Sequence, residues 1–233
     1  MDAEAKPLIQ ALDLKEDTPP KIVGPAPCVT FSGVHDGLHI HVVWNGKDRE
    51  TGVDNVGTVP AALSTYLSVL AFQPDVVISA GTAGGFKAQG AAIGDVFLGS
   101  AVINHDRRIP LPNFDKYGIG YSNCLATPNL QSSLGLKQGV VSSGNSLDYT
   151  DKCMEIMAQH SVAVKEMEAA AIAWACNLYH VPLMCVKAVT DIVDGDRATA
   201  EEFLENLHAA AAALQGTVPK VLTAMAGKRM DEL

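Results

Sequence analysis

The chain has 233 residues, 48% of them hydrophobic, and a formal net charge of −9. This length and composition predict one α/β domain over residues 1–233 with a sizeable core. The acidic balance and the scattered basic residues argue against a nucleic-acid partner, and no apolar run approaches the ~18 residues needed to cross a membrane.

The five cysteines are widely spaced and odd in number, and none forms a C-x-x-C pair. This pattern predicts free thiols in a reducing cytoplasm, not a disulfide framework or a zinc site. The amino-terminal stretch MDAEAKPLIQAL has an acid at position 2 and lacks the basic start of a signal peptide. The final MDEL is similar to an ER-retention tail, an address that acts only on a chain that has entered the ER. We therefore expect a cytoplasmic protein.

Short apolar or alternating runs, typical of strands, recur along the chain. They cover residues 28–33, 38–46, 74–81, 95–104, 139–144, 161–168 and 182–189. Helical patterns follow several of them, at 57–72, 166–179, 199–214 and near 216–226, and Thr199 with Glu202 forms an S/T-x-x-E capping box. Strands that alternate with helices predict a three-layer α/β/α fold with a mixed, mostly parallel central sheet.

The stretch ISAGTAGGFK (residues 78–87) indicates a buried strand followed by a glycine-rich turn. It matches neither G-x-G-x-x-G nor G-x-x-x-x-G-K-[ST], so neither nucleotide-binding fingerprint is present. Glycines here would let a ligand approach the backbone, with free amides facing it. A tight strand-to-loop turn explains the same residues, and both interpretations stay open.

Two acids, Glu166 and Glu168, stand between an apolar strand and the helical stretch AAAIAWAC. Carboxylates near a helix N-terminus are favoured by its dipole, so capping is one explanation for both. Glu168, however, enters a helix that is small or apolar almost all round. A carboxylate in such surroundings needs a polar partner, for which sugar hydroxyls are suitable.

The strand PLMCVKAV leads into Thr190 and Asp191. The carboxyl ends of strands in an open α/β sheet are where ligands bind, which makes Asp191 a candidate for chemistry. A loop cap is the simpler alternative. Asp194 and Asp196 follow, but the spacing does not match a calcium loop, so we predict no metal site.

Eight segments together resemble the nucleoside phosphorylase/hydrolase superfamily, and within it the plant-type 5′-methylthioadenosine nucleosidases. They are AEAKPL, NVGTVPAAL, PDVVISAGTAGGFK, IGDVFL, HDRRIPLPNFDKYG, SSGNSLD, VKEMEAAAIA and KAVTDIVDGD, spread over essentially the whole chain. The resemblance implies a nucleoside phosphorylase-like fold, a homodimer, and no cofactor or metal. It implies hydrolysis of the N-glycosidic bond of 5′-methylthioadenosine to adenine and 5-methylthioribose, as in methionine salvage. Cleavage of S-adenosylhomocysteine would depend on the room beyond the 5′ sulfur.

The resemblance also implies roles for particular residues. Asp191 matches the general acid that protonates or hydrogen-bonds adenine N7, and Glu4 matches the carboxylate that activates the attacking water. A buried Asp191 with a raised pKa would hold the required proton.

The remaining matched positions imply contacts with the substrate. Glu168 and Met167 match the residues that hold the ribose hydroxyls, and Thr82 faces the water and the sugar. Leu147 and Asp148 match the stretch that stacks on adenine and bonds its edge through the backbone. Val56 matches a residue on the sugar and alkylthio side.

Two other members of the superfamily are alternatives. A phosphorylase would carry arginine three residues before Thr82, where this chain has Ser79, so water is favoured as nucleophile. Arg107 and Arg108 could also be considered for phosphate binding, but we expect both in structural or interface ion pairs. A storage-type or catalytically impaired relative would keep the fold without the chemistry, but the matching positions 4, 168 and 191 are all acidic here. A generic dinucleotide-binding module is disfavoured by the missing fingerprint.

The chain departs from the resemblance at its start. The family begins with an apolar strand just before the residues that match DAEA, whereas here only Met1 precedes them. We therefore expect the usual first strand to be missing, its two neighbours to expose unpaired edges, and Glu4 to be poorly ordered unless something ties it down. A shortened gene reading, a truncated product or a variant without activity would each explain this start.

Overall fold

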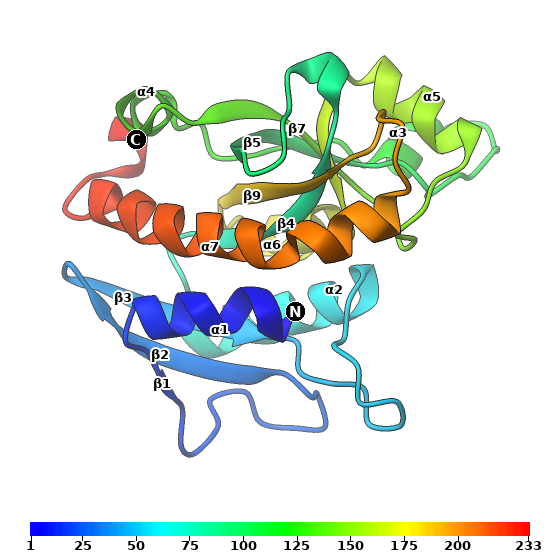
Figure 1. Ribbon diagram of the computed structural model, residues 1–233. Coiled ribbons are helices and arrows are strands. Elements are labelled where there is room, and N and C mark those ends of the chain that lie inside the picture. The colour runs from blue at the N-terminus through cyan, green and yellow to red at the C-terminus, as the bar shows by residue number, and fades with distance from the viewer.

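The computed structural model describes residues 1–233 and consists of two β-sheets with helices around them (Figure 1). The strands are β1 (Lys15–Glu16), β2 (Val29–His35), β3 (Leu38–Trp44), β4 (Val77–Gly85), β5 (Val96–Asn104), β6 (Ser122–Asn123), β7 (Lys137–Ser143), β8 (Val162–Glu166) and β9 (Leu183–Ile192). The helices are α1 (Asp2–Ala11), α2 (Thr58–Phe72), α3 (Asp115–Ile119), α4 (Pro128–Leu134), α5 (Asp151–Gln159), α6 (Ala169–Leu178) and α7 (Thr199–Met225), with 3-10 turns η1 (Lys87–Gln89) and η2 (Met230–Glu232). No helix combines the length and apolar character that crossing a membrane requires.

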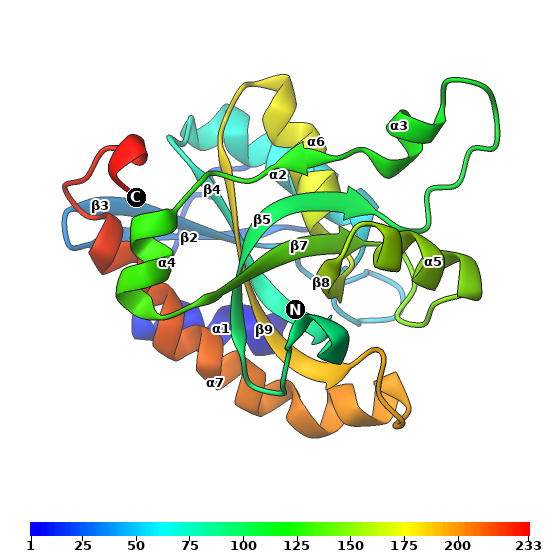
Figure 2. The same cartoon turned by 90° about the horizontal axis from the view of Figure 1, so that it is seen from above.

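The larger sheet has the order β6-β5-β7-β8-β4-β9, and a further β5–β9 pairing closes it into a barrel-like ring. Its long ladders, β4–β9, β5–β7 and β7–β8, are parallel, and the short ones are antiparallel. Figure 2 shows these strands between α7 on one side and α6 on the other. The expected nucleoside phosphorylase-like fold with a mixed sheet is confirmed, whereas the sequence did not indicate the ring closure.

Strand β9 explains how the layers are held together, because its alternate side chains enter two different cores. Met184, Val186 and Ala188 pack with α7 residues, among them Leu214 and Leu222. Leu183, Cys185 and Val189 pack with α6 residues, including Ala169 and Ala173. A strand buried on both faces is mostly apolar, as β9 is apart from Lys187, Thr190 and Asp191.

The smaller sheet, β1-β2-β3, is antiparallel and lies below the ring in Figure 1 with α1 and α2 beside it. Helix α1 follows Met1 directly, and its Leu8 and the next residue after the helix, Leu12, share a core with α7. The start of α1 is fastened to the small sheet because Asp54 Oδ1 accepts hydrogen bonds from Asp2 N–H and from Trp44 Nε1.

The carboxyl-terminal helix differs from the prediction in two ways. Residues 199–225 form one helix through Gly216 and Pro219, where the sequence suggested two. The residue at its N-cap is Ala198, and no side-chain cap is made, so the Thr199 capping box is wrong. Glu202 instead accepts the Ile192 N–H at 2.8 Å, which ties α7 to the end of β9.

Candidate active site

A cavity of about 990 Å³ lies between the two sheets. Its walls come from β3, β4, α1, α2, α7 and the ends of β8 and β9. Seven of the eight predicted site residues line it: Glu4, Val56, Thr82, Leu147, Met167, Glu168 and Asp191. They come from six regions of the chain and meet at the carboxyl ends of β4, β8 and β9, and strand carboxyl ends are where α/β sheets bind ligands.

Asp191 is almost completely buried, with 2% of its surface exposed. Its Oδ1 accepts a hydrogen bond from Thr190 Oγ1 at 2.7 Å, whereas Oδ2 is buried without a partner. Burial raises the pKa of Asp191, against the opposing effects of the Thr190 hydrogen bond and the nearby Lys165 ammonium. A buried carboxyl oxygen without a partner is costly, and a proton shared with a ligand would satisfy it.

The Glu4 side chain is held in place by hydrogen bonds and an ion pair, although it lies close to the amino terminus. Its Oε1 accepts hydrogen bonds from both the N–H and the hydroxyl of Thr82, each at 2.7 Å, and its Oε2 contacts the Met1 ammonium at 2.5 Å. Burial opposes ionisation, but the ammonium and Thr82 outweigh it, so the pKa of Glu4 is lowered. Glu4 and Asp191 therefore line one cavity with pKa values shifted in opposite directions, a pattern typical of acid–base pairs.

The two glutamates of the VKEME stretch have different surroundings. Glu166 caps α6, since its oxygens accept the Glu168 N–H at 3.1 Å and the Ala169 N–H at 2.9 and 3.0 Å. Glu168 makes no cap hydrogen bond to α6, and its Oε1 accepts the Gly57 N–H at 2.7 Å. Burial and the neighbouring Glu166 raise the pKa of Glu168 to about 7. Capping thus explains Glu166, and Glu168 remains available to a ligand.

A buried ion pair underlies these glutamates. Lys187 Nζ lies 2.9 Å from Glu166 Oε2 and donates to Ser79 Oγ at 2.9 Å. Both charged side chains are at most 3% exposed. Burial alone would lower the pKa of Lys187, but the attraction of the Glu166 carboxylate outweighs burial and raises this pKa. The sequence signal for this pair is a lysine inside a mostly apolar strand.

The glycine-rich segment is part of β4, not a turn, and the strand continues to Gly85 with a bulge at Ala83/Gly84. Its glycines are required by close approaches. A Cβ on Gly84 would lie 2.6 Å from Asp191 Oδ2, and one on Gly81 would lie 3.3 Å from Glu4 Oε1. The segment therefore leaves room for the two acids that line the cavity.

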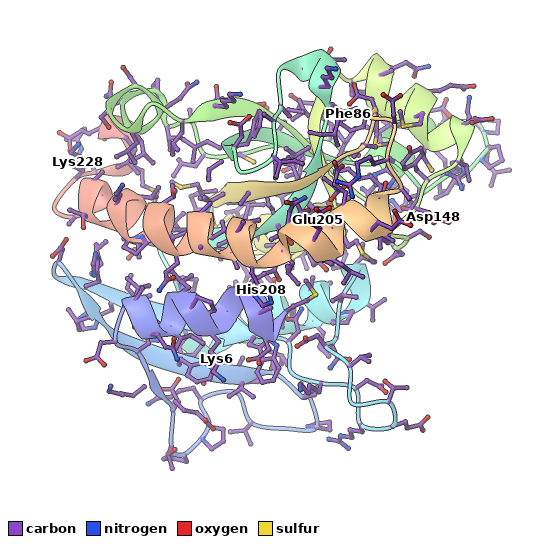
Figure 3. All side chains as sticks on the ribbon, in the orientation of Figure 1. Lys6, Phe86, Asp148, Glu205, His208 and Lys228 are labelled. Carbon is purple, nitrogen blue, oxygen red and sulfur yellow. The ribbon has the colours of Figure 1, made fainter.

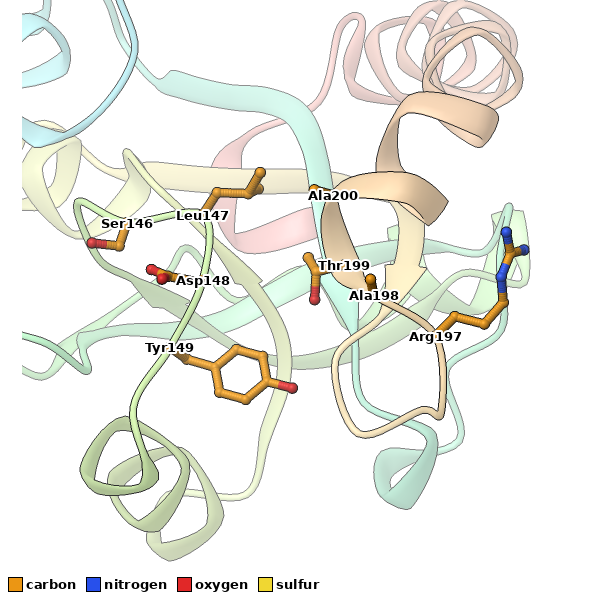
Figure 4. A pocket seen from close by; sticks show the side chains of 8 residues that line it. All are labelled: Ser146, Leu147, Asp148, Tyr149, Arg197, Ala198, Thr199 and Ala200. Carbon is orange, nitrogen blue, oxygen red and sulfur yellow. The ribbon is translucent and has the colours of Figure 1, made fainter.

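The loop Ser146–Tyr149 is held by a second buried lysine. Lys165 Nζ donates to the carbonyls of Ser146 and Leu147, at 3.1 and 2.8 Å. Figure 4 shows Leu147 extending toward Ala200 at the start of α7, across a smaller pocket. This lysine, like Lys187, was not singled out from the sequence.

Asp148 is the predicted site residue that the structure does not place in the main cavity. It is exposed, lines the smaller pocket, and lies near the start of α7 (Figure 3). Two apolar candidates, Val56 and Leu147, border the main cavity, and their side chains are 43% and 42% exposed. Exposed apolar side chains at a cavity are suited to the flat faces of a ligand.

The arginines of the HDRR segment do not reach the main cavity. Arg107 donates to the carbonyls of Gly118 and Tyr117 and lies over the Tyr117 ring, and Arg108 contacts Cys153 Sγ. Within the chain, both arginines make structural contacts with carbonyls, a ring and a thiol. Asp194 has a structural role too, accepting the Lys87 and Ala88 N–H groups.

The sequence and the fold of this chain are both matched by known proteins. The model of the phosphorylase superfamily matches residues 1–223. A 5′-methylthioadenosine nucleosidase of Arabidopsis thaliana is 48% identical over all 233 residues and 87% of its own length. A 5′-methylthioadenosine/S-adenosylhomocysteine nucleosidase of the same plant is 47% identical over this whole chain and 92% of its own.

The solved structures agree with the sequence relatives. The apo structure of Arabidopsis thaliana 5′-methylthioadenosine nucleosidase superposes with a TM-score of 0.98 at 48% identity, over 100% of this chain and 96% of the other. The chain belongs to the phosphorylase superfamily and, within it, to the family of plant-type methylthioadenosine nucleosidases.

Proposed function

We propose that this protein is an N-glycosyl hydrolase that cleaves 5′-methylthioadenosine into adenine and 5-methylthioribose. One observation carries the proposal: Asp191, with a raised pKa and an unpartnered oxygen, lines the same cavity as Glu4, whose pKa is lowered. The two matching Arabidopsis nucleosidases support the choice of substrate.

The acid acts on the leaving group. As the N-glycosidic bond breaks, negative charge develops on adenine, and protonation of a ring nitrogen by Asp191 would stabilise it. Thr190 fixes the Asp191 carboxyl from its Oδ1 side, which leaves Oδ2 to carry the proton to the purine. We assign this proton to adenine N7.

The carboxylates stabilise the other half of the same transition state. The ribosyl group becomes positively charged as adenine leaves, and the carboxyl groups of Glu4 and Glu168 lie on the sugar side in our proposal. Glu4 takes a proton from the attacking water, while Thr82 holds the Glu4 carboxylate in place. Glu168 and Met167 bind the ribose hydroxyls, Leu147 stacks on adenine, and Asp148 bonds the adenine edge through its backbone.

Water is a better candidate than phosphate for the nucleophile. A phosphate site needs fixed positive charge that is free to contact the anion. The strand position three residues before Thr82 holds Ser79, and Lys187, which donates to Ser79, is already neutralised by Glu166 at 2.9 Å. Lys165 is committed to the Ser146 and Leu147 carbonyls. These contacts support hydrolysis over phosphorolysis.

The proposal includes a homodimer. Helices α2 and α6 pack against each other and expose large apolar side chains, namely Leu63, Tyr66, Leu70, Trp174 and Leu178. A group of exposed apolar residues of this size is typical of a protein–protein interface. Light scattering that gave the mass of a single chain would contradict the dimer.

We place the reaction in the cytoplasm, as a step of methionine salvage. The compartment is supported by five cysteines that are all free, with four of them buried. Detection of the tagged full-length protein in a secretory compartment would contradict this placement.

An adenine-release assay on the purified protein tests the function. It offers 5′-methylthioadenosine and S-adenosylhomocysteine separately, each with and without inorganic phosphate. We expect adenine and free 5-methylthioribose from the first substrate without phosphate, and activity on the second will measure the room beyond the 5′ sulfur. Strict phosphate dependence would favour a phosphorylase, and absence of release under all four conditions would favour a storage-type relative.

A further inference from the structure

Lys165 is a buried cation whose hydrogen bonds go to neutral groups. It is 5% exposed, and its ammonium donates to two backbone carbonyls at 3.1 and 2.8 Å. The other buried lysine of the site, Lys187, pairs instead with the Glu166 carboxylate at 2.9 Å. Burial lowers the pKa of Lys165, against the attraction of nearby carboxylates, of which Asp191 has the largest effect. An ammonium with neutral acceptors is costly to bury, so a negative charge nearby would stabilise it.

Gly84 connects this lysine with the acid of the site. It stands opposite Lys165 in the β4–β8 ladder and opposite Asp191 in the β4–β9 ladder. Since neighbouring strands lie about 4.8 Å apart, the Cα atoms of the two charged residues are about 10 Å apart. All three residues line the main cavity, and a Cβ on Gly84 would lie 2.6 Å from Asp191 Oδ2. Because glycine has no side chain, β4 places none between the ammonium and the carboxyl group here.

Lys165 is the one cation among the groups that act on Asp191. Thr190 donates a hydrogen bond to Oδ1, Lys165 of β8 lowers the pKa of Asp191, and Glu202 of α7 raises it. The further titratable groups around Lys165 are Asp148 of the adjoining loop, Cys153 of α5, Glu166 of β8 and His105 after β5. Burial lowers the pKa of His105 to about 4, so this imidazole is uncharged near neutral pH.

The charge balance of this pair changes during the proposed reaction. In the resting site Asp191 is protonated, so the Lys165 ammonium has no counter-charge from it. As the glycosidic C–N bond breaks, its electron pair goes to adenine, and Asp191 gives its proton to adenine N7 and becomes a carboxylate. The lysine then gains a counter-charge. Lys165 therefore stabilises the ionising acid more than the resting acid, which is the condition for lowering the barrier.

The same ammonium fixes the direction of a backbone donor in the loop. One of its two acceptors is the Leu147 carbonyl. The Leu147–Asp148 peptide is trans and planar, so the Asp148 N–H points the opposite way from that carbonyl. No acceptor within the chain takes this N–H. The lysine thus holds a free donor in one orientation, which is suited to a ring nitrogen on the adenine edge.

We propose that Lys165 is a positioning residue for adenine release. Across Gly84 its ammonium stabilises the Asp191 carboxylate once the proton has left, and its hydrogen bonds hold the Asp148 N–H ready for the base. Both roles rest on the proposed function. The interaction between Lys165 and Asp191, however, can be measured in the protein without substrate.

The first test follows the pKa of Asp191 by carbon-13 NMR of the aspartate carboxyl groups, with the Asp191→Asn spectrum assigning the signal. It compares the unmodified protein with Lys165→Gln, which keeps an N–H donor for the carbonyls, and with Lys165→Met, which does not. The control is Lys152→Gln, at a side chain that is 60% exposed. We expect both Lys165 variants to raise the pKa of Asp191 by about one pH unit and the control to leave it unchanged. An unchanged pKa of Asp191 in both Lys165 variants overturns the proposal.

A reciprocal measurement keeps Lys165 in place and decides the matter if neither Lys165 variant folds. Coupling between two sites is mutual, so Asp191→Asn should lower the pKa of Lys165, followed by carbon-13 NMR of the lysine side chains, by about one pH unit. An unchanged pKa of Lys165 overturns the proposal. Because neither NMR experiment uses substrate, failure of the proposed enzymatic function would not affect these results.

Adenine release then tests both roles in turnover. The alkaline limb of the kcat/KM profile should move to higher pH by about one unit in both Lys165 variants, and kcat below that limb should fall at least about threefold. Loss of the hydrogen bonds to the loop should also raise KM at least about threefold in Lys165→Met, and less in Lys165→Gln. A lower melting temperature with no movement of the limb would reduce Lys165 to a purely structural residue. An unchanged KM in Lys165→Met would overturn its hold on the base.

Discussion

Replacing Asp191 by asparagine tests the acid with little disturbance of the site. The asparagine oxygen can keep the Thr190 hydrogen bond of 2.7 Å, and the amide nitrogen takes the place of the unpartnered Oδ2. The new group still donates a hydrogen bond but does not transfer its proton. Loss of general acid catalysis reduces kcat by about 10²- to 10⁴-fold, which is about 2.7 to 5.4 kcal/mol of transition-state stabilisation.

The assay is adenine release from 5′-methylthioadenosine over a range of pH, beside the melting temperature of each protein. The protonated acid is the active form, so kcat of the unmodified protein should fall as pH rises through the raised pKa of Asp191. Asp191→Asn should lack this fall. Asp196→Asn, at an exposed position five residues further on, is the matched control and should retain kcat. Unchanged kcat in Asp191→Asn, or a loss fully explained by unfolding, would refute the reasoning.

Three further predictions concern the groups around this acid. Since the pKa of Glu168 is raised to about 7, the folded protein binds more protons than the unfolded chain between pH 4.5 and about 7. The free energy of unfolding should therefore fall with rising pH in that window, by at most about 1.4 kcal/mol per pH unit. Urea titration of Glu168→Gln should show no such fall from this group. Lys187→Met leaves Glu166 buried without its counter-ion and should cost about 3 to 5 kcal/mol in urea denaturation; a loss under about 1 kcal/mol would contradict a buried ion pair. Gly84→Ala places a Cβ 2.6 Å from Asp191 Oδ2 and should lower kcat at least about tenfold, whereas Gly216→Ala, which meets nothing within 4 Å, should not change kcat.

Much of the fold could be predicted from the chain because strands such as β8 and β9 are buried on both faces and give mostly apolar runs. The ring closure could not, since the antiparallel pairing of Val96–Leu98 with Val186–Ala188 joins segments about ninety residues apart. The continuity of α7 was missed because Gly216 and Pro219 both disfavour helix interiors. Packing of Leu214, Val218 and Leu222 in the core outweighs these local preferences.

The candidate site was found largely through acids in apolar surroundings. Glu168 stood out because a buried carboxylate needs a polar partner, and Asp191 stood out because it follows a buried strand at its carboxyl end. The lysines that complete the site, Lys165 and Lys187, carry the same signal in strands β8 and β9, but their partners lie 18 to 108 residues away in the chain. The contacts of Glu4 depend on the fold of α1 against β4, which no local pattern indicates.

The central claim is that Asp191 gives a proton to the departing base, and a change of leaving group tests it most directly. The ratio of kcat between the unmodified protein and Asp191→Asn is measured with 5′-methylthioadenosine and with the 4-nitrophenyl glycoside of 5-methylthioribose, whose leaving group departs without protonation. We expect a ratio of about 10² to 10⁴ for the nucleoside and a ratio close to one for the nitrophenyl glycoside. Equal ratios for the two substrates would contradict it.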